Sequence, residues 1–296
     1  MNESQREQVI ANAKYLRQVR PIDPEEISDY VEGQPHPATV RQVLREVAVD
    51  LELREHEDGT FAPVADEPIT VQFDGVDALP SAAMRTVEDL LVDAFGAGWP
   101  DGESGDALRS RIRDIKSRYF EGADVEYDEL TALGYAVYHL PATYAAAAYV
   151  LAGLAEDGRV PSRLRVLDVG AGVGGPALAV AELFADSGLV DYTAVEPSAA
   201  GRMLETVLAE TGPNFHVDLE RESAERFEPD GPYDLLLFSN VLSELETPAV
   251  TVGRYLDDLA SDGTVVAIAP ADRETATGLR RIERSVEAEH GATIYA

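Results

Sequence analysis

The sequence contains no cysteine. This absence excludes disulfides, zinc sites with cysteine ligands and iron–sulfur clusters held by cysteine. It also excludes a cysteine nucleophile, and with it methylation of pyrimidine C5 through covalent attack by a thiolate. No metal site is predicted from the remaining residues.

Basic residues are also scarce. The 296 residues include 24 basic and 55 acidic side chains, which gives a formal net charge of −31, and the only lysines are Lys14 and Lys116. This composition resembles that of proteins from salt-loving archaea, where molar salt shortens the Debye length to about 3 Å and screens the repulsion. A disordered acidic chain is excluded because 45% of the residues are hydrophobic and patterned.

Long apolar runs are missing as well. None reaches the roughly 20 residues that a membrane-spanning helix needs, and the polar N-terminal residues do not form a signal peptide. We therefore predict a cytoplasmic protein.

The most informative stretch runs from Leu164 to Glu196. A short apolar run is followed by a glycine-rich turn over residues 170–175, and Pro176 is well placed as the first residue of a helix. A second apolar run ends on Glu196. This order of strand, glycine turn, helix, strand and acid predicts a nucleotide-like ligand at the carboxyl ends of parallel strands.

The identity of that ligand depends on two acidic residues. The glycines fit the dinucleotide pattern G-x-G-x-x-G, but a carboxylate at Asp168 would repel a pyrophosphate and suits a cationic ligand. The segments Val-Leu-Asp-Val-Gly-Ala-Gly and Ala-Val-Glu-Pro-Ser resemble the first two motifs of class I S-adenosylmethionine-dependent methyltransferases. An NAD-dependent oxidoreductase and a turn without a ligand are the alternatives.

The resemblance implies which residues hold S-adenosylmethionine. The glycine turn would lie under the amino-acid part of the cofactor, and Glu196 would accept hydrogen bonds from both ribose hydroxyls. Residues near the end of the fourth strand and in the helices before the first strand would complete the pocket. The candidate cofactor-binding residues are Asp168, Gly170, Ala171, Gly172, Gly174, Glu196, Pro197, Glu222, Ser239, Asn240 and Tyr144.

The predicted fold is α/β, with the Rossmann-like sheet of class I methyltransferases in residues 129–296. Residues 291–296 are predicted to form its sixth strand. No residues remain for the seventh strand that the resemblance implies, so we expect a C-terminally incomplete domain with an open apolar edge on the fifth strand.

Residues 1–66 are predicted to form a winged-helix-like domain. Three helical segments precede a hairpin whose turn contains Asp58-Gly59. Arg41 and Arg45 lie one turn apart on the third helix and are candidate contacts to nucleic acid. A docking domain that binds protein or packs on its own enzyme is an equal alternative.

Residues 67–128 are predicted to form a helical connecting region. A strand at 69–73, a helix at 80–95 and an exposed loop at 96–106 precede a helix at 107–120. That helix carries the densest basic stretch of the chain, with Arg109, Arg113 and Lys116 on one face. These are candidate contacts to RNA phosphates; the alternative is a solvated face paired with nearby acids.

The end of the fourth predicted strand narrows the methyltransferase class. Ser239-Asn240-Val-Leu lacks the Asn/Asp-Pro-Pro-Tyr/Phe motif typical of exocyclic amine methylation. Together with Pro-Ala-Thr-Tyr-Ala-Ala at 141–146, it resembles the methyltransferase-like family associated with the small ribosomal subunit of mitochondria, archaea and bacteria. The resemblance covers residues 135–270. Many members of that family carry an iron–sulfur cysteine cluster, which this chain lacks.

The resemblance implies methylation of RNA or a role in maturation of the small ribosomal subunit. Methyl transfer from a sulfonium mainly requires alignment of the nucleophile, because the leaving group is already activated. The catalytic candidates are Asn240, Ser239 and Glu244, which lie where the acceptor would sit. The alternatives are a non-catalytic assembly factor and a small-molecule methyltransferase with the N-terminal domain as a lid.

Overall fold

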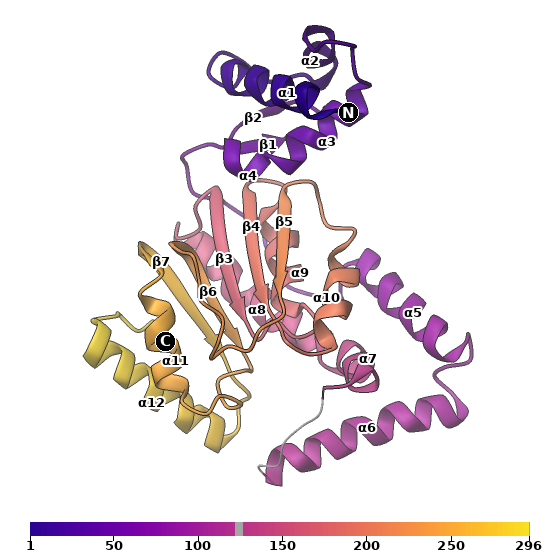
Figure 1. Ribbon diagram of the computed structural model, residues 1–296. Coiled ribbons are helices and arrows are strands. Elements are labelled where there is room, and N and C mark those ends of the chain that lie inside the picture. Colours follow the sequence, from indigo (N-terminus) through magenta and orange to yellow (C-terminus); the bar gives the residue numbers. More distant parts are fainter. Residues whose placement is uncertain (122–126, 296) are drawn as a thin grey trace.

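The computed structural model describes residues 1–121 and 127–295 (Figure 1). Its centre is a five-stranded sheet in which every pair of neighbouring strands is parallel. The strand order is β5-β4-β3-β6-β7, which is the Rossmann-like order 3-2-1-4-5. The strands are β3 (Arg163–Val169), β4 (Leu189–Val195), β5 (Phe215–Glu220), β6 (Tyr233–Ser239) and β7 (Leu259–Ile268).

Helices cover both faces of this sheet. One face packs against α7 (Glu129–Tyr138), α8 (Leu140–Glu156), α9 (Gly175–Phe184) and α10 (Ala200–Leu208). The other face packs against α11 (Pro248–Leu256) and α12 (Arg273–His290). Alternate residues of β3 separate the two cores, because Leu164 and Val166 face the first and Leu167 and Val169 face the second. The sheet is therefore buried on both faces, as a parallel sheet requires.

The N-terminal residues have a small core of their own. The elements are α1 (Glu3–Leu16), α2 (Pro24–Tyr30), α3 (Pro37–Glu46), α4 (Ala48–Leu51) and the antiparallel hairpin β1 (Leu53–Glu55) with β2 (Phe61–Pro63). Phe61 is fully buried and pairs with Ile22 in an isolated bridge. The helices and the hairpin occur in the predicted order, while the winged-helix classification stays a prediction.

This N-terminal unit lies beyond the amino ends of the strands (Figure 1). Asn214, just before β5, accepts a hydrogen bond from the Glu55 backbone N–H at 2.7 Å and donates to the Glu55 carbonyl at 3.0 Å. Arg54 donates to the carbonyl of Asp186, and Glu52 pairs with Arg163 at the start of β3. The unit is thus docked at the end of the sheet opposite to the glycine-rich turn, which disfavours the alternative in which the N-terminal domain is a lid.

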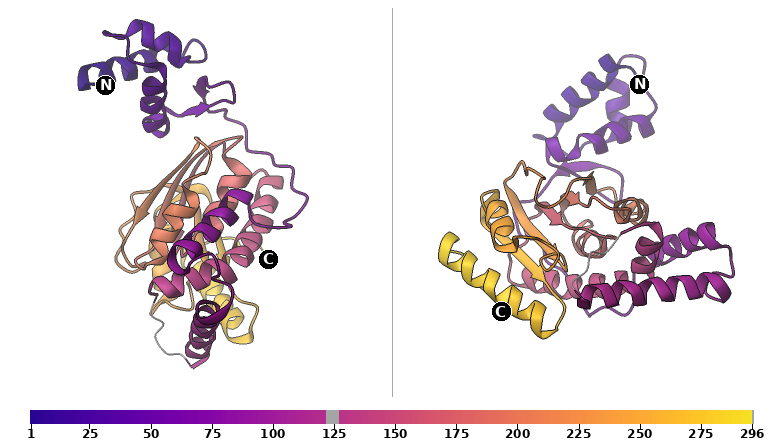
Figure 2. Two further views of the ribbon diagram at one scale, coloured as in Figure 1. Left: turned by 90° about the vertical axis from the view of Figure 1, so that its right-hand side faces the viewer. Right: turned by 60° about the horizontal axis from the view of Figure 1, so that its bottom comes forward.

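The connecting region joins the core of the sheet. Helices α5 (Ser81–Phe95) and α6 (Gly102–Glu121) extend to one side of the sheet (Figure 2). Leu91 of α5 and Leu108 of α6 are buried in the same core as α8 and α9. The strand predicted at 69–73 is wrong, because these residues form no strand and only Ile69 donates a backbone hydrogen bond, to Val160. The helix predicted to begin at Ala107 begins at Gly102, inside the predicted loop.

The prediction of a sixth strand at 291–296 is also wrong for the residues that the structure describes. Helix α12 ends at Gly291, which has a left-handed φ of +69°, and residues 292–295 form no strand. Ala296 lies outside the described residues. Within the described residues, no helix combines the length and the apolar character needed to cross a membrane.

Candidate functional site

Three glycines shape the loop after β3. Gly170, Gly172 and Gly174 have φ values of +73°, +57° and +90°, in the left-handed region that strains a residue with a Cβ. A Cβ on Gly170 would lie 2.5 Å from the Val241 side chain, whereas a Cβ on Gly172 would meet no atom within 4 Å. Gly170 therefore allows the end of β6 to approach, and Gly172 borders open space. We call residues 170–175 the glycine bend.

Helices α8 and α9 begin side by side at this bend. A Cβ on Gly175 would lie 2.2 Å from the Thr143 hydroxyl and 3.0 Å from the Tyr144 backbone N. Pro176 occupies the first turn of α9, where a missing N–H is tolerated. The close approach brings the start of α8 over the carboxyl end of the sheet.

Glu196 lies directly against the glycine bend. One carboxylate oxygen accepts the Gly172 N–H at 2.9 Å, and the other accepts the Ser198 N–H at 2.9 Å. The side chain is 8% exposed. Two backbone N–H groups fix the carboxylate, yet an ionised carboxylate has about four acceptor positions. The Glu196 carboxylate therefore keeps lone pairs that can accept hydrogen bonds from hydroxyl groups of a ligand. The adjacent Pro197 is exposed.

Asp168 is buried below the same bend. Its Oδ2 accepts the Tyr192 hydroxyl at 2.6 Å, and its Oδ1 has no hydrogen-bond partner among the described residues. Burial raises the pKa of Asp168 to about 7; the Tyr192 hydrogen bond opposes this shift, and the negative charge of Glu196 adds to it. A buried acceptor without a partner is unfavourable by about 1–3 kcal/mol, so this oxygen is suited to receive a donor from a cationic ligand.

The end of β6 forms the next wall. Ser239 Oγ is buried without a hydrogen-bond partner among the described residues, and Asn240 has a left-handed φ of +60°. The Asn240 N–H donates to the Ile268 carbonyl of β7 at 2.8 Å. Because Val241 contacts the position of Gly170, the structure brings the β6 end and the glycine bend together.

Tyr127 connects two loops at the carboxyl ends. Its hydroxyl donates to Glu244 Oε1 at 2.8 Å, and its carbonyl accepts the Ala199 N–H at 3.4 Å. Burial raises the pKa of Glu244; the hydrogen bond from Tyr127 lowers it, and the charge of Glu196 raises it further. Sequence reasoning missed Tyr127, because nothing local marks a residue that joins the loops after β4 and β6.

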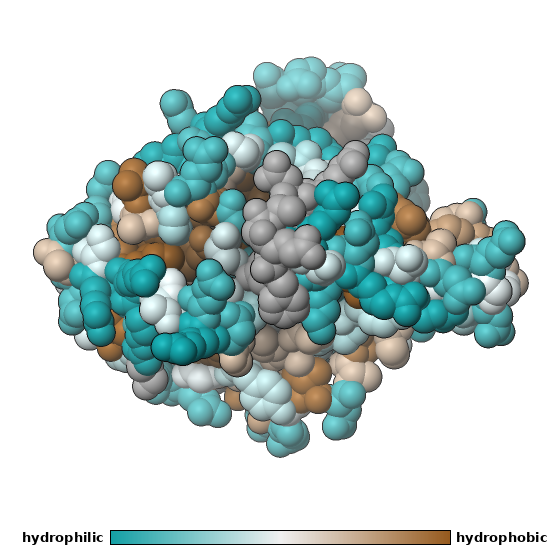
Figure 3. Space-filling view, turned by 90° about the horizontal axis from the view of Figure 1, so that it is seen from below, coloured by the Kyte–Doolittle hydropathy of each residue, from teal (hydrophilic) through white to brown (hydrophobic). Residues whose placement is uncertain are grey.

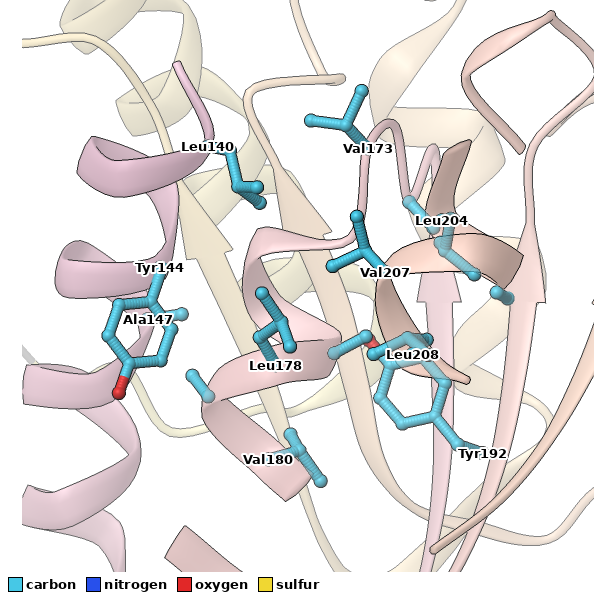
Figure 4. Packing of buried hydrophobic residues seen from close by; sticks show 14 of the residues in the cluster. Leu140, Tyr144, Ala147, Val173, Leu178, Val180, Tyr192, Leu204, Val207 and Leu208 are labelled. Carbon is cyan, nitrogen blue, oxygen red and sulfur yellow. The ribbon is translucent and has the colours of Figure 1, made fainter. Parts of the chain in front are cut away.

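Two predicted cofactor residues, Tyr144 and Glu222, have surroundings different from those of the others. The Tyr144 side chain is 7% exposed and packs between α8 and α9, with its hydroxyl directed away from the loop that carries Val173 (Figure 4). The Tyr144 backbone nevertheless borders Gly175, and a role of this residue in the cofactor pocket stays a prediction. Glu222 is exposed and makes no hydrogen bond with a described residue.

The two arginines predicted to contact nucleic acid from α3 are held by one carboxylate. Arg45 forms two hydrogen bonds with Glu55, at 2.5 and 3.0 Å, and Arg41 lies 3.7 Å from the same side chain. Glu55 is 8% exposed, so the pair stabilises the hairpin against α3. Arg41 and Arg45 therefore help to hold the hairpin, and their contact with nucleic acid stays a prediction.

The basic face of α6 remains on the surface. Arg109, Arg113 and Lys116 are exposed. Arg109 pairs with Asp106 at 2.9 Å across one turn of the helix, a solvent-exposed ion pair that contributes little stability. These three residues keep their predicted role as candidate RNA contacts.

Comparison with known families identifies the chain. A family model described as "Mitochondrial small ribosomal subunit Rsm22" matches residues 129–294. The chain belongs to the Rsm22 family. The region that matches Rsm22 contains the glycine bend, Glu196 and the end of β6. A second family model, an N-terminal domain of unknown function (DUF8157), matches residues 6–57. No curated protein matches the sequence.

Several solved structures are similar to this chain over part or most of its length. The mitomycin 7-O-methyltransferase MmcR is 16% identical, with a TM-score of 0.41 over 96% of this chain and 81% of that one. The plantazolicin methyltransferase BamL, in complex with a triazolic desmethylPZN analog and SAH, is 12% identical, with a TM-score of 0.43 over 64% of this chain and 78% of that one. An S-adenosylmethionine-dependent O-methyltransferase from Thermotoga maritima is 17% identical, with a TM-score of 0.35 over 42% and 43%. The Rsm22 match agrees with the resemblance to the small-ribosomal-subunit family seen in the sequence.

Proposed function

We propose that this Rsm22-family chain is an S-adenosylmethionine-dependent methyltransferase that acts on RNA of the small ribosomal subunit. The observation that carries the proposal is the contact between Glu196 and the glycine bend, at the carboxyl ends of a parallel sheet. Ligands of such sheets bind at this edge. The family's description supports the ribosomal substrate, and the basic face of α6 supports an RNA ligand.

The residues around the bend fit the chemical groups of S-adenosylmethionine. Glu196 would accept hydrogen bonds from the ribose hydroxyls. Asp168 Oδ1, which has no partner in the described chain, would accept one from the ammonium group. Gly172 leaves room for a ligand because no atom lies within 4 Å of its Cβ position. The pairing with a cation would lower the raised pKa of Asp168 and favour its ionised form.

When bound, this cofactor supplies a methyl group on a positively charged sulfur. The residues of the chain then have to orient the acceptor and exclude water, because alignment accounts for much of the rate of such a displacement. Ser239, Asn240 and Glu244 lie beside the bend and are the candidates for holding the acceptor. Glu244, with its raised pKa, is also a candidate to take a proton from the acceptor.

The proposal is tested by calorimetry and by methyl transfer. Glu196→Ala is expected to weaken S-adenosylmethionine binding by about 1–3 kcal/mol, because hydrogen bonds to a charged acceptor are lost. Glu228→Ala, which replaces an exposed acid elsewhere, serves as the control. Labelled methyl groups should appear on small-subunit RNA with the wild-type protein. Equal cofactor affinity in Glu196→Ala and the wild type would contradict the site.

A second candidate function is a non-catalytic assembly factor that binds the cofactor and the small subunit. The family's description, which names a ribosomal subunit and not a reaction, favours it. Co-sedimentation with small subunits without methyl incorporation into any RNA would support this candidate over the enzyme.

A further inference from the structure

Three aromatic side chains follow one another along α7 and the residues on either side of it. The rings of Tyr127 and Tyr135 make an edge contact, with centroids 5.6 Å apart and planes at 67°. Tyr135 and His139 lie closer, with centroids 4.5 Å apart and planes at 40°. We call Tyr127, Tyr135 and His139 the aromatic row. In an edge contact the rim of one ring meets a face of the other. Tyr135 therefore has a ring neighbour on each side, whereas Tyr127 and His139, at the two ends of the row, each have one such neighbour within it.

The aromatic row spans the predicted site. At one end, Tyr127 donates to Glu244, which follows the catalytic candidate Asn240. At the other end, the carbonyl of His139 accepts the Thr143 hydroxyl at 3.1 Å, and this hydroxyl lies 2.2 Å from the Cβ position of Gly175. The row therefore extends from the loop after β6 to the glycine bend.

The row is partly accessible, although its central ring, Tyr135, packs against the core of the sheet. His139 is exposed, Tyr127 and Tyr135 are half-buried, and the neighbouring Tyr138 is 46% exposed. Polar partners also hold its backbone in place: Asp128 caps α7 by accepting the Thr131 N–H at 2.8 Å. A rigid set of partly exposed rings beside a reaction site is suited to hold a flat ligand.

The basic face of α6 lies next to this row. A Cβ on Gly134 of α7 would lie 2.8 Å from the Ile112 side chain of α6, so the two helices pack closely. Arg111 of α6 pairs with Asp128 at the start of α7. Helix α6 has five basic and four acidic residues in a chain of net charge −31. Viewed from below, the side of the molecule formed by α6 is largely hydrophilic, to the right of the residues drawn in grey (Figure 3).

We propose that the aromatic row stacks unpaired nucleobases of an RNA and thereby selects single-stranded or extruded nucleotides as the methyl acceptor. This inference rests on the proposed function, whose substrate it narrows. Aromatic rings stack bases without regard to sequence, while nearby cations contact the backbone. The Tyr127 end holds the base that reacts beside Asn240 and Glu244. The His139 end holds a neighbouring base, and Arg109 and Arg113 contact phosphates.

A paired RNA does not fit this arrangement, because its bases are already stacked on one another. Substrate selection would thus depend on how easily a nucleotide leaves its helix. The aromatic row would select unpaired bases by their flat shape, and the polar groups at the end of β6 would select the atom that accepts the methyl group.

Binding of a labelled, adenine-containing single-stranded RNA tests the inference, with a fully paired hairpin as the competing probe. Tyr135→Ala removes the ring that contacts both end rings, and it is expected to weaken single-strand binding by about 5- to 150-fold, the range for the loss of one base–ring stack. Tyr135→Phe keeps the ring and should bind as the wild type does. Tyr15→Ala removes a tyrosine that is 69% exposed on α1 and serves as the control.

Calorimetry with S-adenosylmethionine separates this inference from the proposed function. Unchanged cofactor affinity together with weaker single-strand binding in Tyr135→Ala supports the aromatic row as an RNA site. Equal binding of single-stranded and paired RNA, or wild-type RNA affinity in Tyr135→Ala, overturns the inference and leaves the cofactor site intact. Loss of cofactor binding in Tyr135→Ala overturns it in favour of a cofactor-lining role. A wild-type protein that binds no S-adenosylmethionine refutes the proposed function itself.

Discussion

Replacement of Asp168 by asparagine separates the stability of the fold from the affinity for the cofactor. The Asp168 side chain is fully buried, and its pKa is raised to about 7 from an ordinary value of 3.8. The folded chain therefore keeps a proton that the unfolded chain loses between these two values. Stability falls as the pH rises through this window, because an acid with a raised pKa is easier to ionise in the unfolded state.

The size of the effect follows from the pKa. Between pH 5 and pH 8 the carboxyl passes through about two units of this window, and each unit corresponds to about 1.36 kcal/mol, so Asp168 lowers the free energy of unfolding by about 2–3 kcal/mol. Asp168→Asn has no such dependence. Its amide can keep the hydrogen bond from Tyr192, although its N–H₂ group lacks a partner at the position of Oδ1.

Denaturant unfolding at pH 5 and pH 8, at one salt concentration, measures this difference. The free energy of unfolding of Asp168→Asn minus that of the wild type should increase by about 2–3 kcal/mol from pH 5 to pH 8. The other carboxylates titrate equally in the variant and in the wild type, so their contributions cancel in this difference of unfolding free energies. A difference that stays constant with pH would show that Asp168 ionises as an exposed carboxyl does, and the argument from its burial would be wrong.

At high pH, Asp168→Asn should stabilise the fold relative to the wild type but weaken the binding of the cofactor. Only the ionised Asp168 attracts an ammonium group, and its ionised fraction rises from about 10% at pH 6 to about 90% at pH 8 for a pKa of about 7. The affinity of the wild type for S-adenosylmethionine should therefore rise by about tenfold over this range, with release of a proton. Asp168→Asn should bind more weakly at pH 8 and show no such dependence.

Three further predictions concern other parts of the chain. Gly172→Ala should abolish cofactor binding and lower stability by about 1–2 kcal/mol, the cost of a Cβ in the left-handed region; Gly153→Ala, in the middle of α8 with nothing within 4 Å of its Cβ position, is the control and should retain binding. Asn214→Ala leaves the Glu55 N–H without an acceptor and should lower the free energy of unfolding by about 1–3 kcal/mol. The Glu55 amide should exchange hydrogen faster in this variant than in the wild type, and faster than the amides of β3. An equal rate of exchange at Glu55 in the variant and the wild type would contradict this anchor. The unfolding temperature should rise with KCl up to molar concentrations because salt screens the acidic surface, and an unfolding temperature independent of salt would contradict the predicted adaptation.

The sequence predicted the parts of the site that are close in the chain. The order of strand, glycine bend, helix and acid between Leu164 and Glu196 is present, because buried strands and left-handed glycines have strong local signatures. The Glu196 carboxylate lies against the bend, as the resemblance implied. Ser239 and Asn240 lie at the end of β6, since consecutive parallel strands bring their carboxyl ends to the same edge.

Features that depend on distant contacts were not predictable in this way. Arg41 and Arg45 have the spacing of a nucleic-acid contact, but Glu55 binds both after the hairpin folds back. Residues 69–73 have the apolar pattern of a strand, yet they pack along the core without a neighbouring strand to pair with. The side chain of Tyr144 points away from the bend because its position on α8 faces α9.

The arrangement of the two ends of the sheet has a consequence for turnover. Residues 1–66 dock at the amino ends, through Asn214 and Glu55, and the glycine bend lies at the carboxyl ends. A cofactor at the glycine bend would therefore enter and leave without passing the N-terminal unit. Release of a used cofactor would not require the two units to separate.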